Sequence, residues 1–268
     1  MPAPYAILEA ATALVGLVGS LFMVLVISVD SWEEADFSLN AVNNSYLQVT
    51  VAASNSELSI YSSRDLLTDP WTTYYYYYQY WGLWKICDLL TDTARATMQS
   101  TGKQVRGKLL YIFVNDRKQC FNFLTDYDEE SRTVSANTKS FMGLHNSTVV
   151  CFMVTIIDLI VANFLAALGI YKKHVPVCMV AGALYCIASV FIFFGLVIFH
   201  VNHHYEQYYC QALYDIQDHI CSSRSVSIGW PVPVAWFGLI LCAMDSVLWV
   251  FLTQAMRIIK TKTMSDRY

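Results

Sequence analysis

Four long apolar runs constrain what this chain can fold into more than any other feature of its sequence. Each run is long enough to cross the hydrocarbon core of a bilayer as a helix, which takes about 20 residues. Only 14% of the residues are charged, whereas about 25% are charged in a typical soluble domain. The sequence therefore predicts an α-helical membrane protein with four transmembrane helices, at residues 7–29, 148–171, 175–201 and 231–256.

The first run has to be distinguished from a cleaved signal peptide, because it is N-terminal and rich in small and apolar residues. No Lys or Arg precedes it, and Glu9 lies near its start. Its apolar stretch is also longer than the core of an ordinary signal peptide. We interpret it as a retained transmembrane helix.

The charges of the short connections predict the sidedness of the chain, because short cytoplasmic loops carry an excess of Lys and Arg. Residues 172–174 read Lys-Lys-His and residues 257–268 are rich in Lys and Arg, whereas residues 202–230 hold more acidic than basic side chains. We therefore expect residues 1–6, 172–174 and 257–268 in the cytoplasm. Residues 30–147 and 202–230 are expected outside the cell.

Two sequons for N-glycosylation agree with this sidedness. Asn43 begins Asn-Asn-Ser and Asn146 begins Asn-Ser-Thr, and both fall in the first loop expected outside the cell. Such acceptor sites predict a surface position in a secreted or extracellular segment. Asn146 lies close to the second apolar run.

The eight cysteines divide by position. Four fall within the apolar runs, where we expect buried small hydrophobic residues. These are Cys151, Cys178, Cys186 and Cys242. The other four form a pair in each loop expected outside the cell, which predicts two disulfides in an oxidising compartment. The pairs are Cys87 with Cys120 and Cys210 with Cys221; unpaired cysteines or a bond between the loops remain the alternatives.

The first loop has the composition of a small antiparallel sheet. Residues 45–62 alternate apolar and polar side chains around Ala-Ser-Asn-Ser, which predicts a hairpin. Residues 72–86 are almost all aromatic or β-branched, which favours a strand. Residues 109–124 are interpreted as two short strands around a turn, and the more polar segment between them and Cys87 as an insertion.

Five consecutive tyrosines, residues 74–78, stand out within this loop. In a strand, alternate side chains point to opposite faces. Tyr74, Tyr76 and Tyr78 therefore form a candidate contact surface, since exposed aromatic side chains are enriched at protein interfaces.

A series of aromatic, glycine and cysteine residues follows the first apolar run in a recognisable order. Trp32 comes first, and then Trp81-Gly82-Leu83-Trp84, Cys87 and Cys120. This order resembles that of the claudin superfamily of four-span membrane proteins, in which a Trp, a Gly-Leu-Trp and two disulfide-bonded cysteines follow one another. The resemblance covers essentially the whole chain.

The resemblance implies a left-handed bundle of four transmembrane helices with a small extracellular antiparallel β-sheet, and a Gly-Leu-Trp segment at the membrane surface. Two departures mark a divergent member. Residues 88–119 separate the first cysteine pair, a longer interval than in typical claudins, and the second loop has a pair of its own. Longer first loops occur in invertebrate septate-junction claudins, the type we favour, and in the calcium-channel γ-subunit-like branch.

Several functional classes lack support in the sequence. The formal net charge of −4 gives no nucleic-acid footprint. No nucleophile elbow, phosphate-binding glycine loop or metal-ligand spacing is present, so we expect no enzyme, no metal and no cofactor. The acidic pair Glu33-Glu34 is expected to be solvated, and His203 and His204 are interpreted as interfacial polar residues.

Three acidic residues fall within the predicted spans: Glu9, Asp158 and Asp245. An ionisable group is costly in the bilayer and should face the bundle interior or a partner. We favour a structural role, with Thr155 and Asn163 as candidate polar partners between helices. An ion path is the alternative.

The chain ends in Ser-Asp-Arg-Tyr. Asp266 and the terminal Tyr268 form a candidate ligand for a PDZ scaffold, where an added strand and a captured carboxylate supply the affinity. An unbound polar tail is the alternative, because typical claudins end in Val.

The resemblance implies a structural protein of lateral cell–cell junctions in the plasma membrane. Its partners are then the lipid bilayer and claudin-like or other junction membrane proteins, bound side by side and across the intercellular space to form a paracellular barrier. An auxiliary subunit or organiser of a membrane channel, receptor or adhesion protein is the alternative. A pore is a third hypothesis, suggested only by the intramembrane acids.

Overall fold

The structure, a computed structural model, describes residues 3–37, 47–55, 58–65, 69–76, 78–88, 120–122, 136–209 and 224–265. The chain divides into two compact units, each assembled from segments that are far apart in the sequence. The helical unit comprises Met1–Ser28, Ser147–Ile198 and Pro231–Tyr268, and the sheet unit comprises Val29–Asn146 and Phe199–Trp230.

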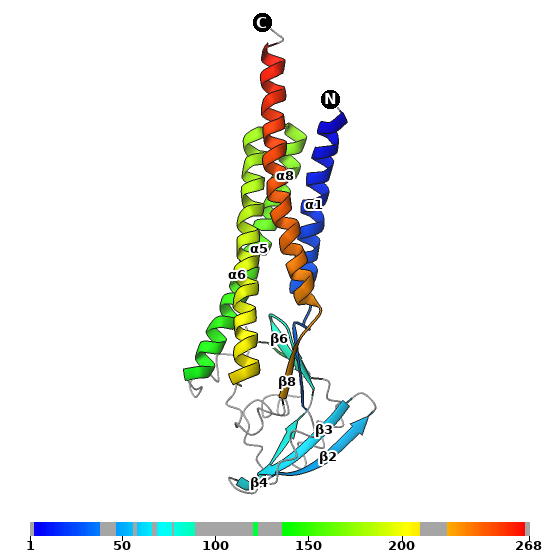
Figure 1. Cartoon of the computed structure of the whole chain (residues 1–268), viewed down its shortest axis with the longest axis vertical. Helices are drawn as coiled ribbons and strands as arrows, with labels where there is room; N and C mark the ends of the chain where they lie inside the picture. Colours follow the sequence, from blue (N-terminus) through cyan, green and yellow to red (C-terminus); the bar gives the residue numbers. More distant parts are fainter. Residues whose placement is uncertain are drawn as a thin grey trace. The chain divides into compact units, whose positions relative to one another are not determined.

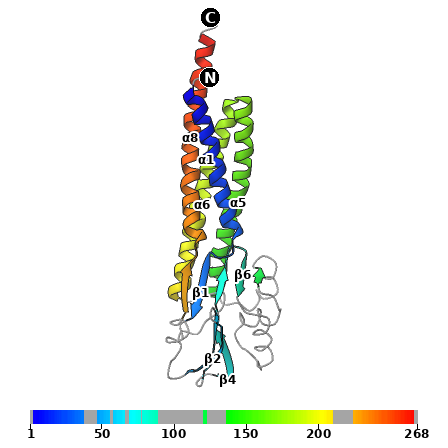
Figure 2. The ribbon, with the colours of Figure 1, turned by 90° about the vertical axis from the view of Figure 1, so that its right-hand side faces the viewer.

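Four long helices account for the four apolar runs (Figures 1 and 2). They are α1 (Ala3–Ser28), α5 (Ala136–Lys172), α6 (Val175–Tyr209) and α8 (Pro231–Ser265). Each is long and apolar enough to cross a membrane. The predicted four-span helical fold is therefore confirmed.

The helices are longer than the apolar runs from which they are predicted. α5 begins within the predicted first loop, and α6 continues to Tyr209 although its apolar run ends at residue 201. Hydrophobicity marks where a helix lies in lipid, but polar residues continue the same backbone hydrogen bonding beyond it. The sequon at Asn146, expected in a loop, therefore lies on a helix, and so does His203.

A tight turn joins α5 to α6. Lys173 adopts a left-handed conformation with φ of 52°, and the backbone N–H of His174 donates to the carbonyl of Gly169 at 3.1 Å. This geometry closes the C-terminus of α5. The start of α1, this turn and the end of α8 lie at the same end of the helical unit (Figure 1).

α1 and α8 pack closely because small residues face their neighbours. A Cβ atom added at Gly19 would lie 3.3 Å from side-chain atoms of Leu241 and Cys242, and one added at Gly238 would lie 2.7 Å from the sulfur of Met23. Small residues permit such close backbone approach between membrane helices.

Large apolar side chains cover the outer faces of the helices, as expected for surfaces in contact with lipid tails. Examples are Ile7, Leu14, Ile160, Phe164 and Phe251. Cys178 and Cys242 are buried as expected, but Cys186 is exposed and Cys151 is only partly buried, so the expectation is wrong for these two. The position of Cys186 on the outer face of α6 was not apparent from an apolar run that is hydrophobic all round.

A five-stranded antiparallel sheet forms the core of the sheet unit, in the order β7-β6-β5-β1-β8. Its strands are β1 (Glu33–Phe37), β5 (Gln79–Trp81), β6 (Lys85–Asp88), β7 (Cys120–Asn122) and β8 (Arg224–Ile228). β1 to β7 come from the first loop, whereas β8 comes from the second and pairs with β1. This contribution of the second loop was missed by sequence reasoning.

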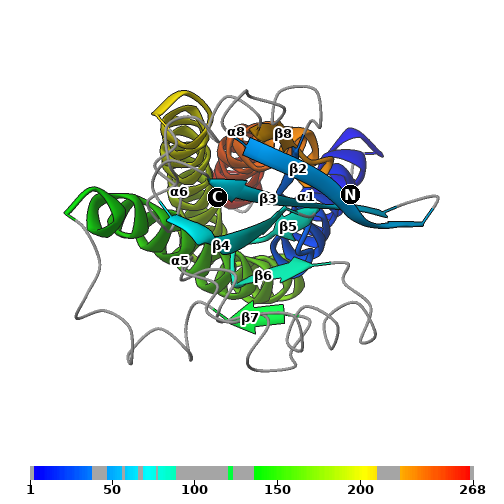
Figure 3. The same cartoon turned by 90° about the horizontal axis from the view of Figure 1, so that it is seen from below.

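A second, three-stranded sheet has the order β2-β3-β4. β2 (Leu47–Asn55) and β3 (Leu58–Asp65) form the hairpin predicted at residues 45–62, and β4 (Asp69–Tyr76) adds the third strand. Figure 3 shows these strands from below.

The single strand predicted at residues 72–86 is wrong. This stretch is divided among β4, β5 and β6, which belong to two sheets. One break is a hairpin turn at Gly82, whose N–H donates to the carbonyl of Lys85 at 2.9 Å. Aromatic composition indicated the strand type but not the turn, because the glycine's role depends on a distant backbone segment at Asp30. Of the two strands expected at 109–124, the described residues cover only β7.

Candidate functional site

The Trp-Gly-Leu-Trp segment turns β5 into β6. Trp81 and Leu83 are buried, whereas Trp84 is half-buried. A Cβ atom added at Gly82 would lie 2.6 Å from the Cα of Asp30, so only glycine fits beside that backbone. The carbonyl of Leu83 lies 3.1 Å from Nε2 of His145.

Trp32 connects two parts of the five-stranded sheet through its backbone. Its N–H donates to the carbonyl of Trp81 at 2.9 Å, and its carbonyl accepts from Gly229 at 2.8 Å. Its side chain is only 1% exposed, and its ring packs edge-to-face on Phe199 with centroids 5.2 Å apart. Edge-to-face pairs of this kind add to the stabilisation from burial. A Cβ atom at Gly229 would collide with the carbonyl of Ser31.

Glu33 lies at the centre of this arrangement. Only 2% of it is exposed, although we expected the Glu33-Glu34 pair to be solvated. Its Oε2 accepts a short hydrogen bond from the indole N–H of Trp81, and its Oε1 lies 2.7 Å from Nδ1 of His203. The carboxylate therefore joins β1, β5 and the last turns of α6. The expectation of solvation is wrong because strand register places Glu33 opposite Trp81.

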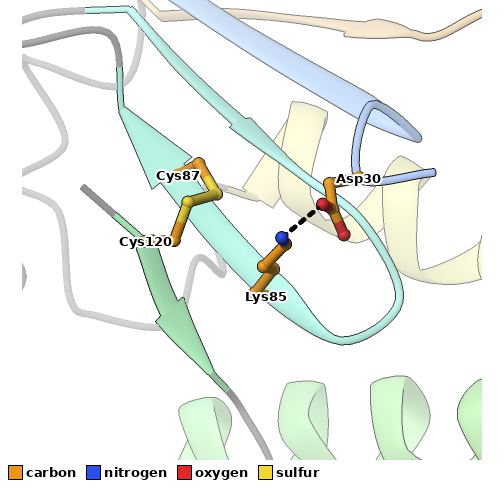
Figure 4. Close-up of a disulfide and its surroundings, with 4 residues drawn as sticks. All are labelled: Asp30, Lys85, Cys87 and Cys120. Atoms are coloured by element: carbon orange, nitrogen blue, oxygen red, sulfur yellow. Dashed lines mark ion pairs between the residues drawn. A yellow bond between two sulfur atoms is a disulfide. The ribbon is translucent and has the colours of Figure 1, made fainter. Parts of the chain in front are cut away.

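A disulfide between Cys87 and Cys120 joins β6 to β7 (Figure 4). The two cysteines are direct partners in the strand register, with Cα atoms 4.1 Å apart. In the chain-entropy model, closing a loop of this length contributes about 3 to 4 kcal/mol. An ion pair between Lys85 and Asp30, 2.7 Å long, lies beside the disulfide. It is partly exposed and contributes little to stability by comparison.

The tyrosine run does not form one continuous strand. Tyr74 and Tyr76 lie in β4 opposite Ser63 and Tyr61, whereas Tyr78 lies outside that strand. Burial, together with a hydrogen bond to Glu34, raises the pKa of Tyr78. The phenol of Tyr78 is therefore half-buried beside β1, and a contact role for Tyr74, Tyr76 and Tyr78 stays a prediction.

The bundle interior holds a polar cluster drawn from all four helices. The Tyr185 hydroxyl donates to Oδ1 of Asn163 at 3.0 Å, and the Asn163 amide donates to the Ser20 hydroxyl at 2.7 Å. Asp245 is fully buried and accepts from the indole of Trp249 at 3.0 Å. Gly16 makes room for this cluster, since a Cβ atom there would lie 2.6 Å from Asp245 and 2.7 Å from the Tyr185 hydroxyl.

The structure does not bring the three intramembrane acids together into one site. Asp245 belongs to the polar cluster, while Glu9 and Asp158 are half-exposed. Thr155 donates to the carbonyl of Cys151 in its own helix. Among the described residues, no group of three His, Cys, Asp or Glu side chains is arranged to hold a metal ion.

Some predicted site residues lie outside the described part of the chain. These are Asn43, Cys210, Cys221, Asp266 and Tyr268. Conversely, the sequence did not predict that Glu33 and His203 contact each other. Glu33 adjoins Trp32 in the sequence, but nothing in the sequence signals that His203 meets its carboxylate.

Comparison with known protein families gives a match over most of the chain. The model of a family described as PMP-22/EMP/MP20/Claudin tight junction matches residues 17–251. A search of curated proteins found no match to the chain. The matched region contains α1 from residue 17 onward, both sheets, α5, α6 and most of α8.

Proposed function

This chain belongs to the PMP-22/EMP/MP20/Claudin family, and from that premise we propose that it is a structural protein of cell–cell junctions. Its helices lie in the bilayer, and its sheets stand outside the cell and associate with neighbouring copies or other junction proteins. The proposal is carried by the five-stranded sheet, which gathers Trp32, the Trp-Gly-Leu-Trp segment and the disulfide into one structure.

Two observations support placing the sheets outside the cell. The disulfide requires an oxidising compartment to form and persist. Exposed basic side chains gather at the ends of α5 and α8, which Figure 1 places at one end of the helical unit. Short basic connections of this kind are typical of the cytoplasmic face. The residues are Lys172, Lys173, Arg257, Lys260 and Lys262.

Association between copies has two candidate surfaces. β7 and β8 are the edge strands of the five-stranded sheet, and an edge strand offers backbone groups to an added strand. The second surface is β4, which carries Tyr74 and Tyr76. A barrier built in this way selects solutes through the charges along the loops.

Localisation and tracer flux in an epithelium test the proposal. We expect tagged protein to concentrate at lateral cell contacts, and its depletion to increase the leakage of a small tracer between cells. Uniform staining of the plasma membrane with an unchanged barrier would contradict a junction role. Co-purification of a channel, receptor or adhesion protein under those conditions would instead identify an auxiliary subunit or organiser.

The last residues of the chain support a scaffold partner on the cytoplasmic side. Asp266 supplies an acidic side chain two residues before the aromatic Tyr268. A PDZ domain binds such an end as an added strand. The proposed partner is therefore a PDZ scaffold, and deletion of the last residues should remove its binding in a pull-down with the full chain.

A further inference from the structure

The Glu33 carboxylate is the most deeply buried charged group that the sheet unit shows among its described residues. Both of its oxygens have a donor, Trp81 on one and His203 on the other. The two donors differ chemically. The indole N–H of Trp81 is a neutral donor only, whereas His203 gains or loses a proton near neutral pH.

Burying a carboxylate is costly unless it is hydrogen-bonded and paired with an opposite charge. Trp81 supplies a hydrogen bond but no charge, so the charge balance at Glu33 depends on His203. The side chain of His203 is 12% exposed, which leaves it open to exchange protons with solvent.

Other titratable groups face this pair from the elements packed around it. His200 and Glu206 lie on α6 within electrostatic reach of His203. His145 on α5 lies within electrostatic reach of Glu33, but its Nε2 is engaged with the carbonyl of Leu83. His203 is therefore the histidine that contacts the carboxylate directly.

We propose that Glu33 and His203 form a proton-dependent latch that holds β1 and β5 against the last turns of α6. With a proton on His203, an imidazolium pairs with the buried carboxylate. When His203 loses that proton, the carboxylate keeps only neutral donors, and the attachment of the two strands weakens. The folded sheet unit thus holds a proton at His203. The stability of the sheet unit therefore falls as the pH rises through the range in which His203 loses this proton.

The latch rests on the proposed function in one respect: a sheet placed outside the cytoplasm is exposed to compartments of different pH. Acidic compartments along the secretory and endocytic routes then tighten the sheet, and neutral fluid at the cell surface loosens it. The latch itself is a property of the isolated protein, so its failure and the failure of the junction role are separate results.

Hydrogen exchange of the purified full chain in lipid nanodiscs tests the latch. Exchange of the peptides that cover β1 and β5 is compared between about pH 5.5 and about pH 8, after correction for the intrinsic pH dependence of amide exchange. We expect on the order of tenfold faster corrected exchange at the higher pH, the equivalent of one pKa unit of linkage. Peptides from the β2-β3 hairpin serve as the internal reference.

Variants assign the effect to the pair. In His203→Gln the pH dependence should disappear, whereas His204→Gln, which alters the adjacent histidine whose ring contacts that of Tyr208, should keep it. Unchanged pH dependence in His203→Gln, or none in the wild-type chain, overturns the latch. If His203→Gln does not fold, Glu33→Gln provides the test. A neutral amide needs no counter-charge, so this variant should also lose the pH dependence. A pH dependence that survives this change overturns the latch.

Discussion

At the scale of single residues, the fold depends on a few positions where a backbone segment leaves no room for a side chain. Gly82 and Gly229 are the clearest, because each faces the backbone of residues 29–32 rather than a movable side chain. Backbone cannot yield as a flexible side chain can, so these glycines are fixed by the distant segment. The family motif is thus explained by packing against the first residues after α1.

Gly82→Ala should destabilise the sheet unit. Its added Cβ atom would lie 2.6 Å from the Cα of Asp30, and relief of this overlap should cost about 1 to 3 kcal/mol. The change is measured as a fall in the thermal unfolding midpoint of the purified protein. Gly143→Ala is the matched control, since a Cβ atom there meets nothing within 4 Å. Equal effects of the two changes would refute the steric role of Gly82.

A second prediction at this scale follows from the hydrogen bonds of the polar cluster in the bundle. A double-mutant cycle of Asn163→Ala and Tyr185→Phe should give a coupling energy of about 0.6 kcal/mol and at most about 1.7, the range measured for hydrogen bonds between membrane helices. The free energy of unfolding in detergent is the measurement. Thr155→Val with Tyr185→Phe is the control cycle, because Thr155 bonds the backbone of its own helix. Strict additivity in the first cycle would argue against the interhelical bond.

At the scale of elements, the tyrosine-rich segment is divided among strands with different roles. β4 pairs with β3 in the three-stranded sheet, whereas β5 pairs with β1 and β6 in the five-stranded sheet. Tyr78 lies between them and is hydrogen-bonded to Glu34. Tyr74 and Tyr76 therefore lie in the three-stranded sheet and Tyr78 lies outside it, and a contact role for the three stays a prediction.

Replacement of both Tyr74 and Tyr76 by Ser should weaken association between copies while the fold is kept. Loss of two aromatic contacts at an interface predicts a decrease on the order of tenfold, measured by energy transfer between differently tagged chains in one membrane. Formation of the Cys87–Cys120 disulfide on a non-reducing gel checks folding. Tyr75→Ser, on the opposite face of β4, is the control. Unaltered association of the double variant would show that Tyr74 and Tyr76 only pack within the protein and do not form the contact surface.

At the scale of the whole molecule, the continuous helices α5 and α6 supply residues to both compact units. The same helix that carries lipid-facing side chains also carries, near its end, the His203 partner of the sheet carboxylate. β8 likewise brings the second loop into the sheet of the first. Described strands of both loops therefore form one sheet, and deletion of either β1 or β8 should disrupt it.

Antibody access to tagged termini and sensitivity to a glycosidase test the sidedness of the whole chain. Tags at both termini should react with antibody only after the cells are permeabilised. A glycosidase should shift the protein through Asn43 and not through Asn146, because Asn146 lies on α5 and Thr148 of its sequon is buried. Asn43→Gln should abolish the shift and Asn146→Gln should not. An external tag signal from intact cells would invert the assigned topology.

The sequence by itself determined the four spans, the hairpin at residues 45–62 and the cysteine pair that forms the disulfide. These follow from local periodicity, from the length of the apolar runs and from the occurrence of one cysteine pair in each loop, all of which can be read from neighbouring residues in the sequence. The tertiary structure alone decided the division of the aromatic segment, the entry of β8 into the sheet and the burial of Glu33. Each of these depends on segments far apart in the chain. From the sequence alone, Glu33 beside Trp32 is expected to be solvated. In the folded protein, strand register and the end of α6 bring Trp81 and His203 to its two carboxylate oxygens.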